Sequence, residues 1–306
     1  MDITIMHTVD GRKTLHLDEY INTLKIYASE GFARVWATQM PTEPDALTVL
    51  AVAGREVPRI EFATGVLPIQ PQHPMNLAQR ALTVNAITGG RLSLGIGLTH
   101  KVVSEGMWGI PYQRNIQRVS EYLDSLLPLL AGDRAAADGE IVSTHGSLSL
   151  SEIAAPPVYL AALGPKMLEL AGRRTAGTVT WMTGPQTLRN HIVPSLRAAA
   201  ESAGRAATDV RTVACLPISV TDDPQSARET AARAFRIYGS LPSYRAMLDR
   251  EGYAGPADAA IVGDEATATA RLAELAALGV DEFVAIVFDR DPGVAERTRA
   301  LLRSVG

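Results

Sequence analysis

Three histidines follow predicted apolar strands, and their side chains are well suited to proton transfer. They are His7, His73 and His100. A free imidazole titrates near neutral pH, so it can donate or accept a proton. A lone histidine is more often a surface or pocket-wall residue than a catalyst, and both interpretations stay open here. Their spacing does not fit HExxH or another local metal pattern, so we expect no metal site.

The corner VYLAALGPKMLELAG, residues 158–172, is a candidate anion site. An apolar strand runs into Gly164, and Pro165 takes the favoured first position of a helix. The free amides at such a helix start bind phosphate or another anion, and Lys166 would add a positive charge. The alternative is an ordinary strand-to-helix corner with good capping residues.

A pair of glycines closes another predicted strand. Gly95 and Gly97 begin a dinucleotide-type pattern, but His100 stands where the third glycine belongs. Two close glycines still let a planar ligand approach the backbone, and a tight turn is the alternative. Trp181 ends a later strand and packs either on a flat ring or in the core. Cys215 lies mid-strand, away from any nucleophile motif, so we expect a buried structural cysteine.

Eight apolar segments alternate with helical patterns along the chain. The predicted strands are Asp2–His7, Arg34–Thr38, Ile60–Val66, Leu92–Ile96, Val158–Ala162, Gly177–Thr183, Val210–Val220 and Glu282–Phe288. Nearly every strand is followed by a helix, and no linker-like stretch cuts the chain. This pattern favours a closed (β/α)8 TIM barrel formed by residues 1–306 as a single domain. A doubly wound open sheet is the alternative, and in both folds the site lies at the carboxyl ends of the strands.

Three segments depart from the alternation. The loop 97–112 after the fourth strand is longer than an ordinary strand–helix connection. Residues 133–157 contain short alternating pieces, EIVS and SLSL, which predict a small β excursion before the fifth strand. Residues 238–258 form an insertion after the seventh strand. A glycine-containing turn is expected at Asp10–Gly11.

The composition of the chain limits which binding partners and which cellular compartment we expect. The 306 residues are 46% hydrophobic and 20% charged, with a net charge of −4 and a pI near 5.9. No basic face is expected, so nucleic acid is not a predicted partner. Charged residues interrupt every apolar run before the ~20 residues that span a bilayer, and the N-terminus does not look like a signal peptide. With one cysteine and no internal disulfide, the predicted compartment is the cytoplasm.

Five segments of the chain together form a recognisable set. They are TGVLPIQPQHPMNLAQRALTVNAITGGRLSLGIG, AALGPKMLELAGRRTAGTVTWMTGPQTL, VGDEATATARLAELAALGVDEFVAI, EGFARVWATQ and RVSEYLDSLLPLLAGD. Together they resemble the luciferase-like (bacterial-luciferase-type) oxidoreductases, and the resemblance is closest to the branch that uses the deazaflavin coenzyme F420. These segments span essentially the whole chain and are specific at family level, but they say little about the substrate. The resemblance implies a barrel, F420 as cofactor (alternatively FMN), a small-molecule substrate and a homodimer.

The resemblance also implies roles for particular residues. In this family a non-prolyl cis peptide in the third strand backs the deazaflavin ring, and here it would be Gly65–Val66. The turn from Gly95 to Leu98 would line the cofactor, and the amides of Gly164 to Met167 would hold its phosphate. The full set expected at the cofactor is Gln39, Thr64, Gly65, Val66, Gly97, Leu98, Ala161, Ala162, Gly164, Pro165, Lys166, Met167 and Trp181. The set expected at the substrate is His7, His73 and Trp108.

Two departures from the family pattern concern the acid–base chemistry. Many members end the second strand with Asp-His or Glu-His, whereas this chain has Thr38-Gln39. Some deazaflavin members have an acidic glutamate where this chain has His100. His100 is therefore the predicted catalytic residue, with a polar pocket wall as the alternative.

The expected reaction is transfer of a hydride between C5 of the deazaflavin and a carbon of a small organic substrate. That carbon would belong to a C=C, a C=N or an alcohol. The alternatives are an FMN-dependent monooxygenase on the same barrel and a flavin-binding barrel without catalysis. The sequence does not reveal the substrate or the direction of hydride flow.

Overall fold

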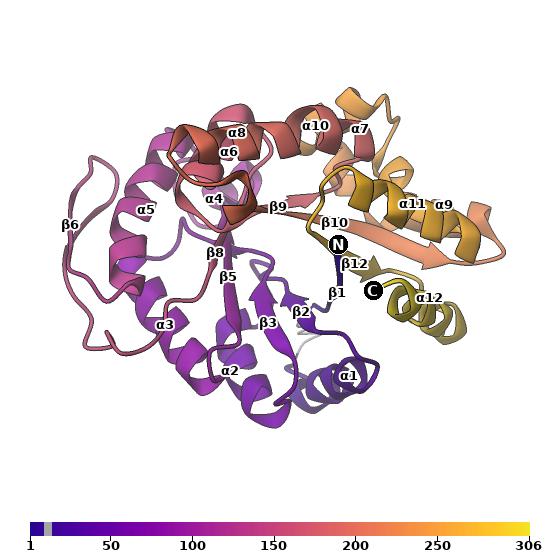
Figure 1. Cartoon of the computed structure of the whole chain (residues 1–306), viewed down its shortest axis with the longest axis horizontal. Coiled ribbons are helices and arrows are strands. Elements are labelled where there is room, and N and C mark those ends of the chain that lie inside the picture. Colours follow the sequence, from indigo (N-terminus) through magenta and orange to yellow (C-terminus); the bar gives the residue numbers. More distant parts are fainter. Residues whose placement is uncertain (9–13) are drawn as a thin grey trace. The chain divides into compact units, whose positions relative to one another are not determined.

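The computed structural model describes residues 1–8 and 14–306 (Figure 1). The chain divides into two compact units. One unit, here unit 1, comprises residues 1–6, 30–32 and 162–306, and unit 2 comprises residues 7–29 and 33–161. The turn expected at Asp10–Gly11 lies outside the described residues. The predicted single-domain organisation stays a prediction.

Unit 2 is built on four parallel strands, each in contact with the next. In order they are β2 (Arg34–Ala37), β3 (Glu61–Thr64), β5 (Leu92–Gly97) and β8 (Val158–Ala161), with the short β4 (Leu67–Pro68) also paired to β5. The helices of this unit are α1 (Leu17–Ser29), α2 (Ala46–Glu56), α3 (Pro74–Ile87), α4 (Lys101–Gly106) and α5 (Asn115–Leu130). Asp45 is the N-cap of α2, because its carboxylate accepts a hydrogen bond from the Thr48 amide at 2.8 Å.

Unit 1 also has four parallel strands in contact. In spatial order they are β9 (Gly177–Trp181), β10 (Arg211–Val220), β12 (Glu282–Val287) and β1 (Asp2–Met6). A further short strand, β11 (Ile261–Gly263), pairs with the end of β10. The helical segments are α6 (Pro165–Arg174), α7 (Pro185–Thr187), η1 (Leu188–Ile192), α8 (Val193–Ser202), η2 (Ala207–Asp209), α9 (Pro224–Ala234), η3 (Arg236–Gly239), α10 (Pro242–Glu251), η4 (Pro256–Ala259), α11 (Glu265–Ala277) and α12 (Pro292–Val305).

All eight predicted strands are present, with ends displaced by a few residues, and helices follow them. The third strand differs because it breaks after Thr64 and resumes as β4. The loop 97–112 contains the short helix α4, and the insertion 238–258 is mainly helical. The three-residue β11 was missed, because so short a strand carries no periodic signal.

The β excursion exists, but its strands were wrongly located. They are β6 (Ala135–Asp138) and β7 (Ser143–Gly146), an antiparallel hairpin, rather than EIVS and SLSL. A polar contact between α5 and the hairpin explains the position. The carboxylate of Glu121, on α5, accepts hydrogen bonds from the amides of Ile141 and Val142 at 2.7 and 2.9 Å, which holds the turn of the hairpin against the helix.

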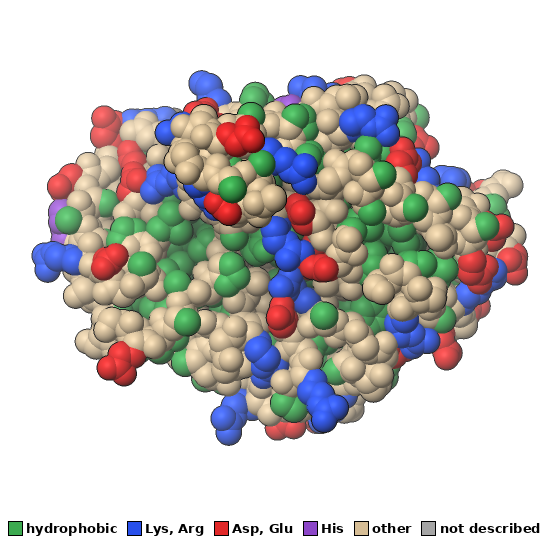
Figure 2. Space-filling view, viewed as in Figure 1, with side chains coloured by type: hydrophobic (Ala, Val, Ile, Leu, Met, Phe, Trp, Pro, Cys, Tyr) green, Lys and Arg blue, Asp and Glu red, His purple; other side chains and the backbone are tan. Residues whose placement is uncertain are grey.

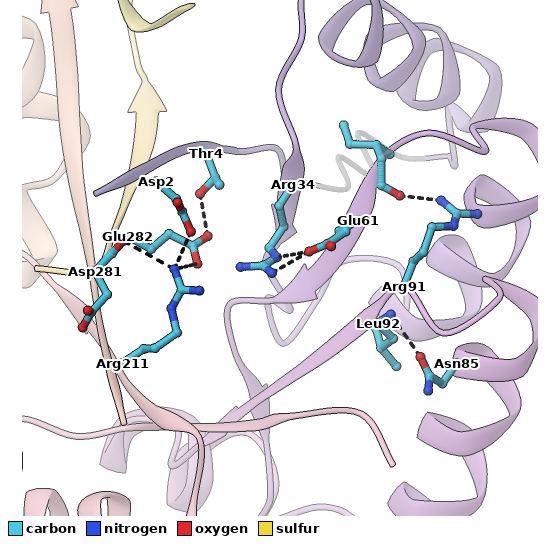
Figure 3. A network of polar contacts seen from close by, with 11 residues as sticks. Asp2, Thr4, Arg34, Glu61, Asn85, Arg91, Leu92, Arg211, Asp281 and Glu282 are labelled. Carbon is cyan, nitrogen blue, oxygen red and sulfur yellow. Dashed lines mark hydrogen bonds and ion pairs between the residues drawn. The ribbon is translucent and has the colours of Figure 1, made fainter. Parts of the chain in front are cut away.

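Charged side chains stand at the first residues of several strands (Figure 3). In unit 1, Arg211 begins β10 and lies 2.5 Å from Asp2 and 3.7 Å from Glu282, the first residues of β1 and β12. Glu282 is fully buried and also accepts a 2.8 Å hydrogen bond from the hydroxyl of Thr4. A buried charge is tolerated only when it is paired and hydrogen-bonded, and here both conditions hold.

Unit 2 has a similar arrangement at the starts of its strands (Figure 3). Arg34 and Glu61 begin β2 and β3, pair in register, and are joined by a 3.0 Å hydrogen bond. Arg91 donates to the carbonyl of Gly54 at 2.6 Å at the end of α2, and Asn85 accepts from the amide of Leu92 at the start of β5 at 3.1 Å. The amino ends of the strands are thus occupied by structural polar contacts.

The surface shown in Figure 2 carries interspersed acidic and basic side chains, in keeping with the small net charge. Among the described residues, no helix combines the length and the apolar composition needed to cross a membrane.

Candidate functional site

The pairing of the third strand with β5 contains one extra residue on the β3–β4 side. Ala63 pairs with Ser93 and Leu67 pairs with Ile96, so residues 64–66 face only residues 94–95. An extra residue on one strand is a bulge, which redirects the backbone and is common next to active sites. The predicted cis peptide lies within it, between Gly65 and Val66, and this prediction is confirmed.

Thr64 supplies the polar contacts that the strands lose at this bulge. Its hydroxyl donates to the carbonyl of Gly95 at 2.8 Å and accepts from the amide of the same residue at 2.9 Å. Thr64 is fully buried, so water cannot satisfy these groups instead. The side chain therefore joins β3 to β5 at the point where the backbone ladder is interrupted.

The glycines of β5 are required by close packing against the bulge. A Cβ at Gly95 would lie 1.9 Å from the carbonyl oxygen of Thr64. A Cβ at Gly97 would lie 2.9 Å from the Cβ of Ala161 and 3.0 Å from a methyl of Val66. The structure thus brings together Thr64, Val66, Gly97 and Ala161, four of the predicted cofactor residues.

The segment after β5 is tied to the chain that follows the bulge. The side-chain oxygen of Gln70 accepts a hydrogen bond from the amide of Thr99 at 3.1 Å, while Ile69 donates to the carbonyl of Gly97 at 3.0 Å. Gln70 is 8% exposed. These contacts hold Leu98, a predicted cofactor residue, and His100 beside the bulge. Gln70 was not among the predicted site residues, although its place in a Pro-rich corner after a strand was visible in the sequence.

His100 is the N-cap residue of α4 and is half-buried. Its side chain makes no capping hydrogen bond. Burial lowers the pKa of His100 below its ordinary value, because the charged imidazolium is poorly solvated there. At neutral pH the side chain is therefore in its neutral form.

Two hydrogen bonds close residues 104–110 of this loop into a turn. The hydroxyl of the buried Ser104 donates to the carbonyl of Ile110 at 2.8 Å, and the amide of Ile110 donates back to the Ser104 carbonyl at 2.8 Å. Trp108, predicted at the substrate, lies half-buried inside this closed turn. Its contact with a substrate stays a prediction.

Three other predicted residues have structural contacts in unit 2. His7 stacks on Tyr20 with ring centroids 5.0 Å apart. The side-chain oxygen of Gln39 accepts from the amide of Ala46 at 2.7 Å, at the start of α2. His73 caps α3 through one ring nitrogen, and its Nε2 lies 3.1 Å from the carbonyl of Ser143 in the β6–β7 hairpin. Their roles toward a ligand stay predictions.

Unit 1 contains the predicted anion corner. Gly164 is the N-cap of α6, and no side chain caps it. Gly164, Pro165 and Lys166 are exposed, and a Cβ built at Gly164 would meet no atom within 4 Å. Pro165 has no amide hydrogen and the Met167 amide donates to the carbonyl of Gly164 at 3.1 Å, so the amides left for an anion in this segment are those of Gly164 and Lys166, with open space beside Gly164. Ala162, by contrast, is buried, and its carbonyl accepts from Thr178 at 3.3 Å.

Trp181, at the end of β9, belongs to an aromatic cluster. Its ring meets the rings of Phe235 and Tyr238 edge-on, at 5.6 and 5.5 Å. Tyr238 in turn meets Tyr244 at 5.1 Å, and Phe235 meets Phe288 at 5.7 Å. The insertion after the seventh strand therefore covers the end of β9 with aromatic side chains.

A cluster of three or more His, Cys, Asp or Glu side chains able to hold a metal ion does not occur in the described part of the chain. Cys215 is buried, as predicted, and burial raises the pKa of its thiol.

Comparison with known proteins defines the family. The family model described as luciferase-like monooxygenase matches residues 3–304, and the chain belongs to this luciferase-like family. A 5,10-methylenetetrahydromethanopterin reductase of Methanolobus tindarius is 29% identical over 241 residues, which are 78% of this chain and 72% of that protein. An F420-dependent glucose-6-phosphate dehydrogenase of Mycolicibacterium fortuitum is 30% identical over 204 residues, 63% of this chain and 60% of that protein.

A solved structure confirms the predicted fold. The coenzyme F420 dependent tetrahydromethanopterin reductase of Methanopyrus kandleri superimposes with a TM-score of 0.83 at 20% identity, covering 99% of this chain and 97% of that chain. The fold is a closed barrel of eight parallel strands with flanking helices, a (β/α)8 TIM barrel.

The contacts of Thr64 lead to a stability prediction. Thr64→Val keeps the shape of the side chain but leaves the buried amide and carbonyl of Gly95 without these partners. We expect it to lower the free energy of unfolding by about 3 kcal/mol, measured by urea denaturation. Thr64→Ser, the matched control, keeps the hydroxyl and should lose less than about 1.5 kcal/mol. Equal losses in the two variants would contradict this assignment.

Proposed function

We propose that this protein is an F420-dependent oxidoreductase that transfers a hydride between the deazaflavin and a carbon of a small organic substrate. The observation that carries the proposal is the similarity, over most of the chain, to a reductase and a dehydrogenase of this family, the latter F420-dependent by name. A homodimer in the cytoplasm is the expected form.

The start of α6 fits the phosphate of the cofactor. Its amides lie at the positive end of the helix dipole, and the open space beside Gly164 leaves room for a phosphate oxygen. Lys166 is exposed in the first turn and can add charge. Within the predicted range Gly164 to Met167, the amides of Gly164 and Lys166 would therefore hold the phosphate, because Pro165 has no amide hydrogen and the Met167 amide donates to the Gly164 carbonyl.

The bulge in unit 2 fits a flat ring. Gly65 and Val66 are half-buried, and the glycines of β5 remove side chains that would otherwise occupy the space against Val66 and Ala161. A surface of this kind supports a ring through backbone and small apolar groups. Val66, Gly97 and Leu98 would line the ring.

F420, when bound, supplies or accepts the hydride at C5 of its ring. The chain's own residues hold that ring, bring the substrate carbon to it and manage the proton. His100 would accept a proton from an alcohol during oxidation or return one during reduction, through its imidazole. The half-buried position of His100 limits competing water.

A second candidate is an FMN-dependent monooxygenase, which the description of the matched family model favours. The test is a binding titration of the purified protein with F420 and with FMN, in the oxidised and reduced forms. We expect saturable binding of F420 with a change in its fluorescence. Tight binding of FMN, with oxygen uptake on reduction and no binding of F420, would contradict the proposal.

Gly164→Ala tests the phosphate contact. The methyl group would meet no protein atom within 4 Å, so the thermal midpoint should stay unchanged. The same methyl would occupy the space proposed for the phosphate, so the Kd for F420 should rise about tenfold. The Kd for the phosphate-free deazaflavin fragment of F420 should stay within a factor of two. An unchanged affinity for F420 would place the phosphate elsewhere.

The lowered pKa of His100 predicts the pH dependence. A base must be neutral, so kcat/KM for substrate oxidation should be full at neutral pH and fall as pH drops through a pKa below about 6.5. His100→Gln should remove this inflection and lower kcat about a hundredfold. His145→Gln alters an exposed histidine paired with Asp138 and is the control, with the native profile expected. An inflection that survives in His100→Gln would assign the titration to another group.

A further inference from the structure

A histidine outside the predicted site is bonded to the loop that begins α6. The Nε2 of His191 lies 2.8 Å from the carbonyl oxygen of Leu163, and since a carbonyl accepts, this nitrogen donates. His191 is half-buried and lies on η1. Both residues belong to unit 1, as does the whole of α6.

η1 is a turn of π-helix, and the sequence explains it. The amide of Val193 donates to the carbonyl of Leu188, five residues back rather than four. Pro194 follows, without an amide hydrogen, and its ring would collide with the carbonyl of Asn190 in a regular α-helix. The wide turn relieves that collision. Wide turns of this kind inside helices frequently occur at functional sites.

The bond from His191 determines the orientation of one peptide group. The peptide joining Leu163 to Gly164 is planar and trans, so its carbonyl and its N–H point in opposite directions. Holding the Leu163 carbonyl on His191 therefore directs the Gly164 N–H away from His191. The preceding peptide is held in the same manner, because the Ala162 carbonyl accepts from Thr178 at 3.3 Å.

The helix that carries His191 is itself fixed at its beginning. Glu251, 7% exposed at the end of α10, accepts hydrogen bonds from the amides of Gln186 and Thr187. The α6 and α8 helices also pack closely, since a Cβ at Gly172 would lie 2.3 Å from the carbonyl oxygen of Leu196. His191 therefore extends from a helical segment that these contacts hold in place. Displacing His191 together with the loop would cost free energy.

We propose that His191, presented by the π-turn that Pro194 imposes, is the positioning residue for the anion-binding start of α6. It orients the Gly164 amide so that the helix start is arranged for a phosphate before the ligand arrives. This inference rests on the proposed function, because it assumes that the phosphate of F420 binds there. It predicts an effect on the phosphate-bearing ligand alone.

The experiment compares the Kd of F420 with that of the phosphate-free deazaflavin, by fluorescence titration of native and variant protein. His191→Phe removes the donor and keeps a ring, and we expect about a fivefold weaker affinity for F420. The affinity for the phosphate-free compound should stay within a factor of two. His191→Gln places an amide donor near the position of Nε2 and should restore native affinity.

Pro194→Ala tests the cause of the geometry. It should let the helix return to α-helical bonding, move His191 from Leu163 and weaken F420 binding about as much as His191→Phe does. Pro128→Ala, which alters the proline inside α5 of unit 2, is the matched control and should leave the ratio of the two affinities unchanged. Circular dichroism and thermal midpoints verify that each variant is folded.

The outcomes separate the two proposals. The role of His191 would be overturned if His191→Phe weakened the affinities for F420 and for the phosphate-free deazaflavin equally, or left the ratio of the two affinities unchanged. It would also be overturned if His191→Gln did not restore the native affinity for F420. If native protein binds FMN and neither deazaflavin, the proposed function fails, and the same ratio measured with FMN and riboflavin then decides on His191. If none of these ligands binds, both proposals fall.

Discussion

The pair of hydrogen bonds between Thr64 and Gly95 is the constraint on which the bulge in unit 2 depends. One extra residue between β3 and β4 interrupts the ladder to β5, and a buried backbone without partners would be costly. The threonine hydroxyl resolves this by acting as donor and acceptor to the same residue. The approach is possible only because Gly95 has no Cβ, which would otherwise lie 1.9 Å from the Thr64 carbonyl.

The two ends of the strands are used differently. At their amino ends, Arg211 with Glu282 and Arg34 with Glu61 form structural pairs, of which the buried Glu282 is the most demanding (Figure 3). At their carboxyl ends lie the cis peptide after β3, the glycines of β5, the start of α6 and the aromatic cluster after β9. This division is the one that a (β/α)8 barrel imposes, with stability at one end and chemistry at the other.

The fold could be predicted from the sequence because the barrel repeats one local pattern, an apolar strand followed by an amphipathic helix. Apolar runs of strand length, followed by amphipathic helices, located all eight strands. The cis peptide at Gly65–Val66 came from the family resemblance, since no local preference distinguishes that bond. The hairpin strands were misplaced because their position depends on Glu121, a contact between segments about twenty residues apart.

The sequence could not predict contacts that depend on the direction in which a helix presents its side chains. His73 was conspicuous after a strand, yet one of its ring nitrogens caps α3 and the other faces a hairpin carbonyl. His191 was inconspicuous, since its direction depends on a π-turn whose trace in the sequence is Pro194 alone. Spacing along the chain gives the order of residues, but a single widened turn changes which of them face a neighbouring loop.

The candidate site is built more from backbone than from side chains, and this bears on how specificity arises. The groups that we propose for the cofactor are a cis peptide, close-packed glycines and helix amides, none of which changes charge with pH. In the proposed function these groups would bind the ring and the phosphate of the cofactor, and none of them is proposed to contact the substrate. We propose that selection of the substrate comes from other segments, the closed turn around Ser104 and the insertion that carries Tyr238. Shared cofactor contacts combined with different substrate loops would account for relatives named for a pterin and for a sugar phosphate.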